Sequence, residues 1–110
     1  MKILVTGGFG YIGAHFINRL KGHEVLVVEN FCQGKNNIIE GIPYKEIDIR
    51  NKEKLLDVFR EFKPDIVVHY AALANVPDSV ANPAKYYDTN IIGSLNVLES
   101  MREVSCKKII

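Results

Sequence analysis

A glycine-rich turn near the N-terminus constrains the fold of this chain more than any other feature. Residues 2–6 form a short apolar run rich in β-branched side chains, which is typical of a buried strand. Gly8, Gly10 and Gly13 then fit the pattern G-x-G-x-x-G, and Gly7 adds an overlapping frame. Apolar residues recur at helical spacing beyond the glycines, so we expect a strand, a tight turn and a helix that opens inside the turn.

An acidic residue stands where this type of turn places the ribose of a dinucleotide. The apolar run Glu24–Glu29 ends in an acid about twenty residues after the first glycine. The glycines of such a unit let backbone approach a pyrophosphate, and the helix N-terminus favours its charge. Glu29 would accept hydrogen bonds from the ribose and repel a 2′-phosphate, and no Arg occurs in residues 30–34. The sequence therefore favours NAD over NADP; the alternatives are a turn that serves only packing and a solvated acid.

The rest of the chain alternates strands with helices. Strands are expected over residues 2–6, 24–29, 44–48 and 65–70, with the opening of a fifth over 107–110. Helices are expected over residues 11–21, 52–63 and 83–101, with loops over 30–43 and 73–82. We therefore expect one Rossmann-like α/β domain over residues 1–110. Its doubly wound parallel sheet would have the order 3-2-1-4-5 and stop at the start of strand five.

Composition excludes several classes of partner. The chain of 110 residues carries a formal charge of +1, which gives no electrostatic case for nucleic acid or an anionic membrane. No apolar stretch approaches the ~20 residues of a membrane span. Cys32 and Cys106 are too few for a disulfide scaffold, so a cytoplasmic location is expected. The three histidines show no metal-ligand spacing, and His69 in an apolar strand is interpreted as a hydrogen-bonded core residue.

Four expected strand ends bring acids and minimal side chains to one sheet edge. These ends carry Gly7, Glu29, Asp48 and Ala71. Ligands of open α/β sheets bind at the carboxyl ends of strands, beside the switch point between strands one and four. Asp48 and Ile49 are candidates to flank an adenine, with a helix-capping Asp as the alternative. Ala71 and Ala72 would let a cofactor lie against strand four.

The chain resembles the extended short-chain dehydrogenase/reductase family, most closely the UDP-glucose (UDP-galactose) 4-epimerases. The resemblance spans nearly the whole chain. Its residues are Val5–Gly13, Glu29–Asn30, Gly34, Asp48–Arg50, His69–Ala72, Ser79–Val80, Pro83, Tyr86–Tyr87, Asn90 and Gly93–Asn96. It departs from the family in Glu29, where Asp is usual, and in Ala74, where many epimerases carry Lys.

The resemblance implies a tightly held NAD that takes hydride from C4 of a UDP-hexose and returns it to the other face of the 4-keto sugar. It also implies a UDP-sugar substrate and a homodimer for the full-length protein. The implied cofactor-binding residues are Gly7, Gly10, Tyr11, Ile12 and Gly13 at the pyrophosphate, Glu29 and Asn30 at the ribose, Asp48 and Ile49 at the adenine, and Tyr70, Ala71, Ala72, Leu73 and Asn90 on the nicotinamide side.

The family's general base is absent from these residues. That base is a Tyr four residues before a Lys, and none of the five tyrosines here has Lys at that spacing. We therefore expect the N-terminal NAD-binding part of such an enzyme, with no catalytic residue, no substrate domain and no activity alone. A 4,6-dehydratase, a UDP-glucuronate or UDP-N-acetylglucosamine 4-epimerase, and a non-catalytic NAD-binding module are the alternatives. An apolar stripe is formed by Tyr87, Ile91, Leu95, Leu98 and Met101, of which we expect part to cover the sheet and part to promote self-association.

Overall fold

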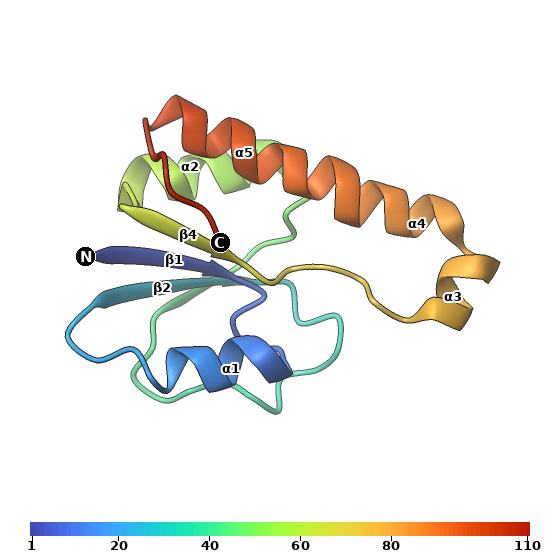
Figure 1. The fold of residues 1–110 in the computed structure, drawn as a ribbon, viewed down its shortest axis with the longest axis horizontal. Helices are drawn as coiled ribbons and strands as arrows, with labels where there is room; N and C mark the ends of the chain where they lie inside the picture. Colours follow the sequence, from blue (N-terminus) through green and yellow to red (C-terminus); the bar gives the residue numbers. More distant parts are fainter.

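A parallel sheet forms the centre of the computed structural model, which describes all of residues 1–110 (Figure 1). The strands β1 (Lys2–Thr6), β2 (Glu24–Glu29), β3 (Tyr44–Glu46) and β4 (Ile66–His69) lie in the order β3-β2-β1-β4. Every pairing is parallel. The expected Rossmann-like topology is thus confirmed, with the switch point between β1 and β4.

The C-terminal residues occupy the fifth position of the sheet. Ile109 pairs in parallel with Val67 in a single bridge. The Val67 N–H donates to the Lys108 carbonyl at 2.9 Å, and the His69 N–H donates to the Ile110 carbonyl at 2.8 Å. The expected order 3-2-1-4-5 therefore holds.

Helices cover both faces of the sheet (Figure 1). They are α1 (Tyr11–Ile17), α2 (Lys52–Phe62), α3 (Val76–Ala81), α4 (Pro83–Tyr87) and α5 (Ser94–Glu103), with a π-helical segment η1 (Asp88–Gly93) that joins α4 to α5. α1 lies on one face, where Ile17 packs among Val5 and Val27. α2 and α5 lie on the other, where Phe59 and Val97 pack against the sheet. No helix is long and apolar enough to cross a bilayer.

Several expected boundaries are wrong. α1 ends at Ile17, because the chain continues to Leu20 through tighter bonds, such as Leu20 N–H to the Ile17 carbonyl at 2.9 Å. β3 ends at Glu46, because beyond it only the Ile47 N–H still donates to β2, at the Glu29 carbonyl. Residues 76–81 form α3 instead of a loop, since the Asn75 side chain accepts the Asp78 N–H at 3.0 Å and caps the helix.

Asn51 and Asn82 behave differently as helix caps. Asn51 accepts the Lys54 N–H at 3.2 Å and caps α2. Asn82 makes no such cap for α4; its amide donates to Asp78 of the preceding helix at 2.9 Å. Asp78 also accepts from Tyr86 and Lys85, so this carboxylate joins α3 to α4.

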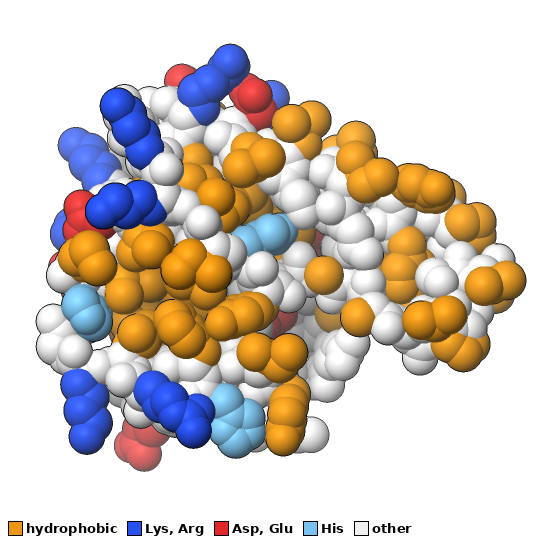
Figure 2. Space-filling model, viewed as in Figure 1, with side chains coloured by type: hydrophobic (Ala, Val, Ile, Leu, Met, Phe, Trp, Pro, Cys, Tyr) orange, Lys and Arg blue, Asp and Glu red, His pale blue; other side chains and the backbone are white.

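Most of the apolar stripe of the last long helix lies on the outside. Tyr87, Ile91, Leu95 and Leu98 are 64%, 53%, 49% and 48% exposed. The buried face carries instead small and polar residues together with two apolar ones: Thr89, Gly93, Asn96, Val97, Ser100 and Met101. The expectation that part of the stripe covers the sheet is therefore wrong for these four residues and holds only for Met101, which is 4% exposed and packs in the core cluster with Leu4 and Val67. Figure 2 shows hydrophobic side chains along the projecting arm that includes α3 and α4, to which the exposed Val76 and Val80 belong.

Candidate functional site

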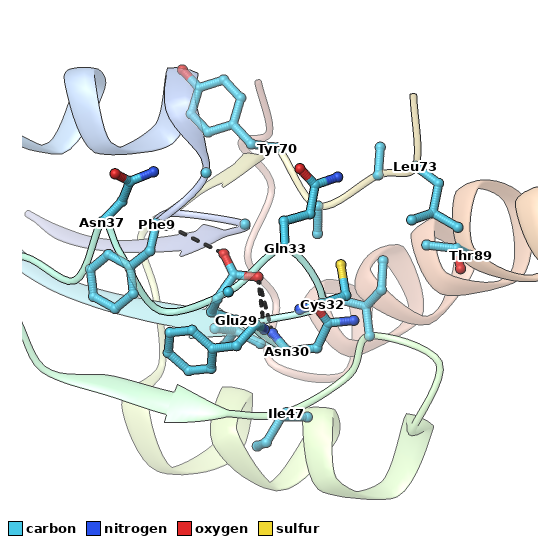
Figure 3. Close-up of a pocket in the computed structure, with 18 of the residues that line it drawn as sticks. Phe9, Glu29, Asn30, Cys32, Gln33, Asn37, Ile47, Tyr70, Leu73 and Thr89 are labelled. Carbon is cyan, nitrogen blue, oxygen red and sulfur yellow. Dashed lines mark hydrogen bonds between the residues drawn. The ribbon is translucent and has the colours of Figure 1, made fainter. Parts of the chain in front are cut away.

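A cavity of about 460 Å³ opens at the carboxyl edge of the sheet. Three segments form most of it: the glycine turn after β1, the loop after β2 and the extended segment after β4 (Figure 3). Ten residues proposed from the sequence line it: Gly7, Gly10, Tyr11, Glu29, Asn30, Ile49, Tyr70, Ala71, Ala72 and Leu73. Ile12, Gly13, Asp48 and Asn90 do not line it.

The glycine turn brings three backbone segments into close contact. A Cβ on Gly7 would lie 2.6 Å from the Ala71 nitrogen, and its φ of +65° is one that side chains disfavour. A Cβ on Gly13 would lie 2.6 Å from the Gly7 carbonyl oxygen, so the absence of a side chain here lets α1 pack directly against the turn. Gly10 is less crowded, since its nearest such contact is 3.3 Å. As the N-cap of α1 it supplies no side-chain acceptor, so the first-turn N–H groups lack a side-chain cap.

Glu29 points into the cavity and holds the surrounding loops (Figure 3). One carboxylate oxygen accepts the Phe9 N–H at 3.3 Å, and the other accepts the N–H groups of Asn30 at 3.1 Å and Phe31 at 3.3 Å. Phe31 has a φ of +56°, a left-handed backbone conformation that residues with a side chain disfavour, and these hydrogen bonds help to hold it. The carboxylate is therefore fixed at the cavity wall beside the glycine turn.

Asp48 lies outside the cavity, in a network of charged and polar side chains. Its carboxylate accepts the Arg50 guanidinium at 2.9 and 3.0 Å, and the Asn30 amide at 3.2 Å. The Arg50 hydrogen bonds lower the pKa of Asp48 to about 2, and Asp48 in turn raises the pKa of Arg50. Arg50 also contacts Asp88 at 3.3 Å. This geometry connects the loop after β2 with η1, and only Ile49 of the two proposed adenine residues lines the cavity.

The segment after β4 forms the wall of the cavity away from Glu29 (Figure 3). Thr89, 9% exposed, adds a side chain to this wall from η1. Its neighbour Asn90 makes two hydrogen bonds to the backbone of Leu73, both 2.8 Å long.

His69 is a partly buried residue whose two ring nitrogens both lie within hydrogen-bond distance of a side-chain hydroxyl, so the prediction of a hydrogen-bonded histidine is confirmed but that of a core position is not. Its Nδ1 lies 2.5 Å from Thr6 Oγ1, and its Nε2 lies 2.9 Å from Ser94 Oγ. Burial lowers the pKa of the imidazole, so it is neutral at pH 7. No group of three or more His, Cys, Asp and Glu side chains is arranged to hold a metal ion.

Sequence patterns missed more than half of the cavity lining. The missed residues are Phe9, Val28, Phe31, Cys32, Gln33, Gly34, Asn36, Asn37, Ile47, Arg50, Lys85 and Thr89. Those of the loop after β2 follow directly from the position of Glu29, which was the available signal. Lys85 and Thr89 come from a helix distant in sequence and carried no signal of their own.

Comparison with known proteins identifies the chain's relatives. The NAD dependent epimerase/dehydratase family matches over residues 3–110. UDP-glucose 4-epimerase of Neisseria meningitidis serogroup C is 42% identical, over 99% of this chain and 35% of that protein. The protein of the same name from Klebsiella pneumoniae is 40% identical, over 100% of this chain and 86% of the Klebsiella sequence. The chain thus spans about a third of the length of the Neisseria relative, but most of the Klebsiella sequence.

Solved structures agree with this assignment. The Thermus thermophilus UDP-glucose 4-epimerase in complex with NAD superposes with a TM-score of 0.94 at 42% identity, covering 99% of this chain and 36% of the other. The Thermotoga maritima UDP-glucose 4-epimerase with UDP-glucose gives a TM-score of 0.95 at 41% identity, with the same coverage. From the glycine turn, the sheet order and these matches we conclude that the chain belongs to the NAD-dependent epimerase/dehydratase family.

Proposed function

We propose that these 110 residues are the NAD-binding portion of a UDP-glucose 4-epimerase. The observation that carries the proposal is the cavity at the switch point of the sheet, where the glycine turn, Glu29 and the segment after β4 meet. Relatives of about 40% identity bear the name UDP-glucose 4-epimerase, and one solved relative is a complex with NAD. Cytoplasmic location, a UDP-sugar substrate and a homodimer belong to the same proposal for the whole protein.

Each part of the cavity suits one part of the dinucleotide. Uncapped N–H groups at the start of α1 favour a pyrophosphate beside Gly10 and Tyr11. Glu29, already fixed by three backbone N–H groups, has one lone pair left for a ribose hydroxyl, on the oxygen that accepts the Phe9 N–H. The small Ala71 and Ala72 leave space beyond the end of β4 for the remainder of the dinucleotide.

Asp48 plays an indirect part in this scheme. Its carboxylate is engaged by Arg50 and Asn30, so we propose that it orients Asn30 at the ribose and that Ile49 alone contacts the adenine. In the same way Ile12 and Gly13 contribute through the backbone of α1. NAD would supply reversible hydride transfer, while the residues of this chain bind and orient it.

A titration with NAD and NADP tests the proposal. We expect wild-type protein to bind NAD at least tenfold more tightly than NADP, because the Glu29 carboxylate repels a 2′-phosphate. Glu29→Gln should bring the affinities for NAD and NADP closer together, because it removes the charge that repels the 2′-phosphate. Gly10→Val should abolish binding of both without unfolding the chain, since Gly10 is exposed and a Cβ there has one close neighbour, the Gly7 carbonyl oxygen at 3.3 Å.

Two controls make the titration decisive. Gly22→Val changes a glycine with no atom within 4 Å of its Cβ position, although its φ of +76° makes some loss of stability expected. Circular dichroism and thermal melting separate this loss from a loss of binding. Equal affinity for NAD and NADP, or unchanged NAD binding by Gly10→Val, contradicts the proposal.

The 110-residue chain should show no epimerase turnover. None of its five tyrosines has Lys four residues later, and a positioned general base contributes about 10²–10⁴-fold to such a rate. The measurement is conversion of UDP-galactose to UDP-glucose by purified protein supplied with NAD. Conversion above the rate of a heat-denatured sample would show that another residue of this chain acts as the base.

A further inference from the structure

We propose that Asn90 is a positioning residue, which fixes the cavity wall formed by Ala72 and Leu73 and does not itself bind the cofactor. The inference rests on the proposed function, because the wall matters only if a dinucleotide lies against it. It revises the role that sequence resemblance assigns to Asn90. The reason lies in where its side-chain amide is directed.

The Asn90 amide pairs with both backbone groups of one residue. Its Oδ1 accepts the Leu73 N–H at 2.8 Å, and its Nδ2 donates to the Leu73 carbonyl at 2.8 Å. Leu73 lines the cavity, whereas Asn90 does not. The amide therefore holds the wall from behind, on the side away from a ligand.

The segment after β4 depends on this support because it extends beyond the reach of β1. The Tyr70 N–H donates to the Thr6 carbonyl at 2.9 Å, and the Ala71 N–H donates to Thr6 Oγ1 at 3.3 Å. The N–H of Ala72 makes no hydrogen bond within the chain. Leu73 is the next fixed point, and Asn90 is its partner.

The helix that carries Asn90 is itself held in place at this point. Ser94, four residues later, contacts His69 Nε2 at 2.9 Å, at the end of β4. Gly93 lies against Ile49, since a Cβ there would be 2.6 Å from Ile49 Cδ1. These contacts fix the π-helical segment η1 relative to the sheet, and such segments occur often at functional sites.

Loss of the amide should weaken binding at one end of the cavity only. Glu29 holds the adenosine end in the proposed function, and Leu73 lies at the other (Figure 3). ADP lacks the nicotinamide riboside and so does not reach the Leu73 wall. Removing Asn90 should therefore affect NAD and spare ADP.

The experiment compares Asn90→Ala with wild type in two measurements. The first is amide hydrogen exchange, in which Leu73 should lose protection while Leu4 and Val5 in β1 keep theirs. The second is calorimetric titration, in which NAD should bind about five- to tenfold more weakly and ADP within twofold of wild type. Asn75→Ala is the matched control, because it removes an Asn side chain that bonds backbone at α3, outside the cavity.

A second variant covers the case in which Asn90→Ala does not fold. Asn90→Asp keeps an acceptor for the Leu73 N–H but places a carboxylate oxygen beside the Leu73 carbonyl, so it should show the same selective loss. Retained Leu73 protection, equal weakening of NAD and ADP, or unchanged NAD affinity in both variants overturns the positioning role. Failure of wild-type protein to bind NAD refutes the proposed function instead, and the wild-type titration separates the two results.

Discussion

At the scale of single residues, charged and polar side chains in this domain bond mainly to backbone and to one another. Glu29 accepts three backbone N–H groups, and Asn90 pairs with the backbone of Leu73. Asp48 contacts Arg50 and Asn30 through side chains. Each interaction holds a loop beside the cavity, so the side chains that shape the site are in part distinct from those that face it.

The carboxylate of Asp48 should make stability depend on acid pH. Its pKa is about 2 in the folded state against 3.8 for an ordinary Asp, so folding favours the ionised form. The stabilisation is complete above pH 4 and is lost as pH falls toward 2. Because solvent screens charges at this partly exposed site, the contribution of the Asp48 carboxylate to the free energy of unfolding is about 1 kcal/mol.

Denaturant unfolding of wild type and Asp48→Asn at several pH values measures this effect. The difference in unfolding free energy between the two proteins should shrink between pH 4 and pH 2, because protonation removes the charge from the wild-type side chain only. Asp57→Asn serves as the control, since its only ion pair, with Arg60, is a 3.9 Å contact at the surface. A difference that stays constant down to pH 2 would contradict the role assigned to the Arg50 contact.

At the scale of elements, the helix that runs from α4 through η1 to α5 packs through small and polar residues. Gly93 and Ser100 are buried, and the Asn96 amide donates to the Ile49 carbonyl at 3.0 Å. Such residues let the helix lie close to the face of the sheet and bond to the loop after β3. The close approach leaves no space for added side-chain atoms.

Gly93→Ala should therefore destabilise the fold. The new Cβ would lie 2.6 Å from Ile49 Cδ1, and overpacking of this kind costs about 1–3 kcal/mol. Thermal and denaturant unfolding measure the loss. The double variant Gly93→Ala with Ile49→Val, which shortens the opposing side chain, should recover part of it, and no recovery would show that the strain arises elsewhere.

At the scale of the whole molecule, apolar residues are exposed along one face of the helix that runs from α4 through η1 to α5. Tyr87, Ile91, Leu95 and Leu98 are each about half exposed or more and share one helix face. Large contiguous apolar patches are uncommon on soluble monomers. The arrangement therefore favours association through this face.

We expect the 110-residue protein to self-associate, and charge on the apolar face to prevent it. Sedimentation velocity over a wide range of concentrations should show wild type shifting to larger species, while Leu95→Glu stays monomeric. Lys54→Glu, on α2, is the control for added negative charge outside this face. A wild-type monomer at the highest concentration would refute the prediction.

Periodicity and turn chemistry predicted most of this fold. The prediction of a parallel sheet of order 3-2-1-4-5 is correct. It rested on the glycines after an apolar run, the acid at the end of the next strand and the alternation of strands with helices, which are local signals that agree with one another. Three features were missed. Helix α3 depends on the cap that the Asn75 side chain provides, the end of α1 on a change to tighter bonds, and the end of β3 on whether the neighbouring strand remains within reach.

The sequence by itself determined the layout of the sheet and the edge at which its loops converge, because spacing along the chain dictates both. Only the tertiary structure decided which face of the last helix is buried and which side chains reach the cavity. The buried face of that helix is the more polar one: it packs on a face of the sheet, where Asn96 finds a hydrogen-bond partner in the loop after β3 and Ser100 Oγ has none. Asn90 and Thr89 are adjacent in sequence, yet one holds the backbone behind the wall while the other lines the cavity. That distinction depends on the direction of each side chain from a helix already packed in place.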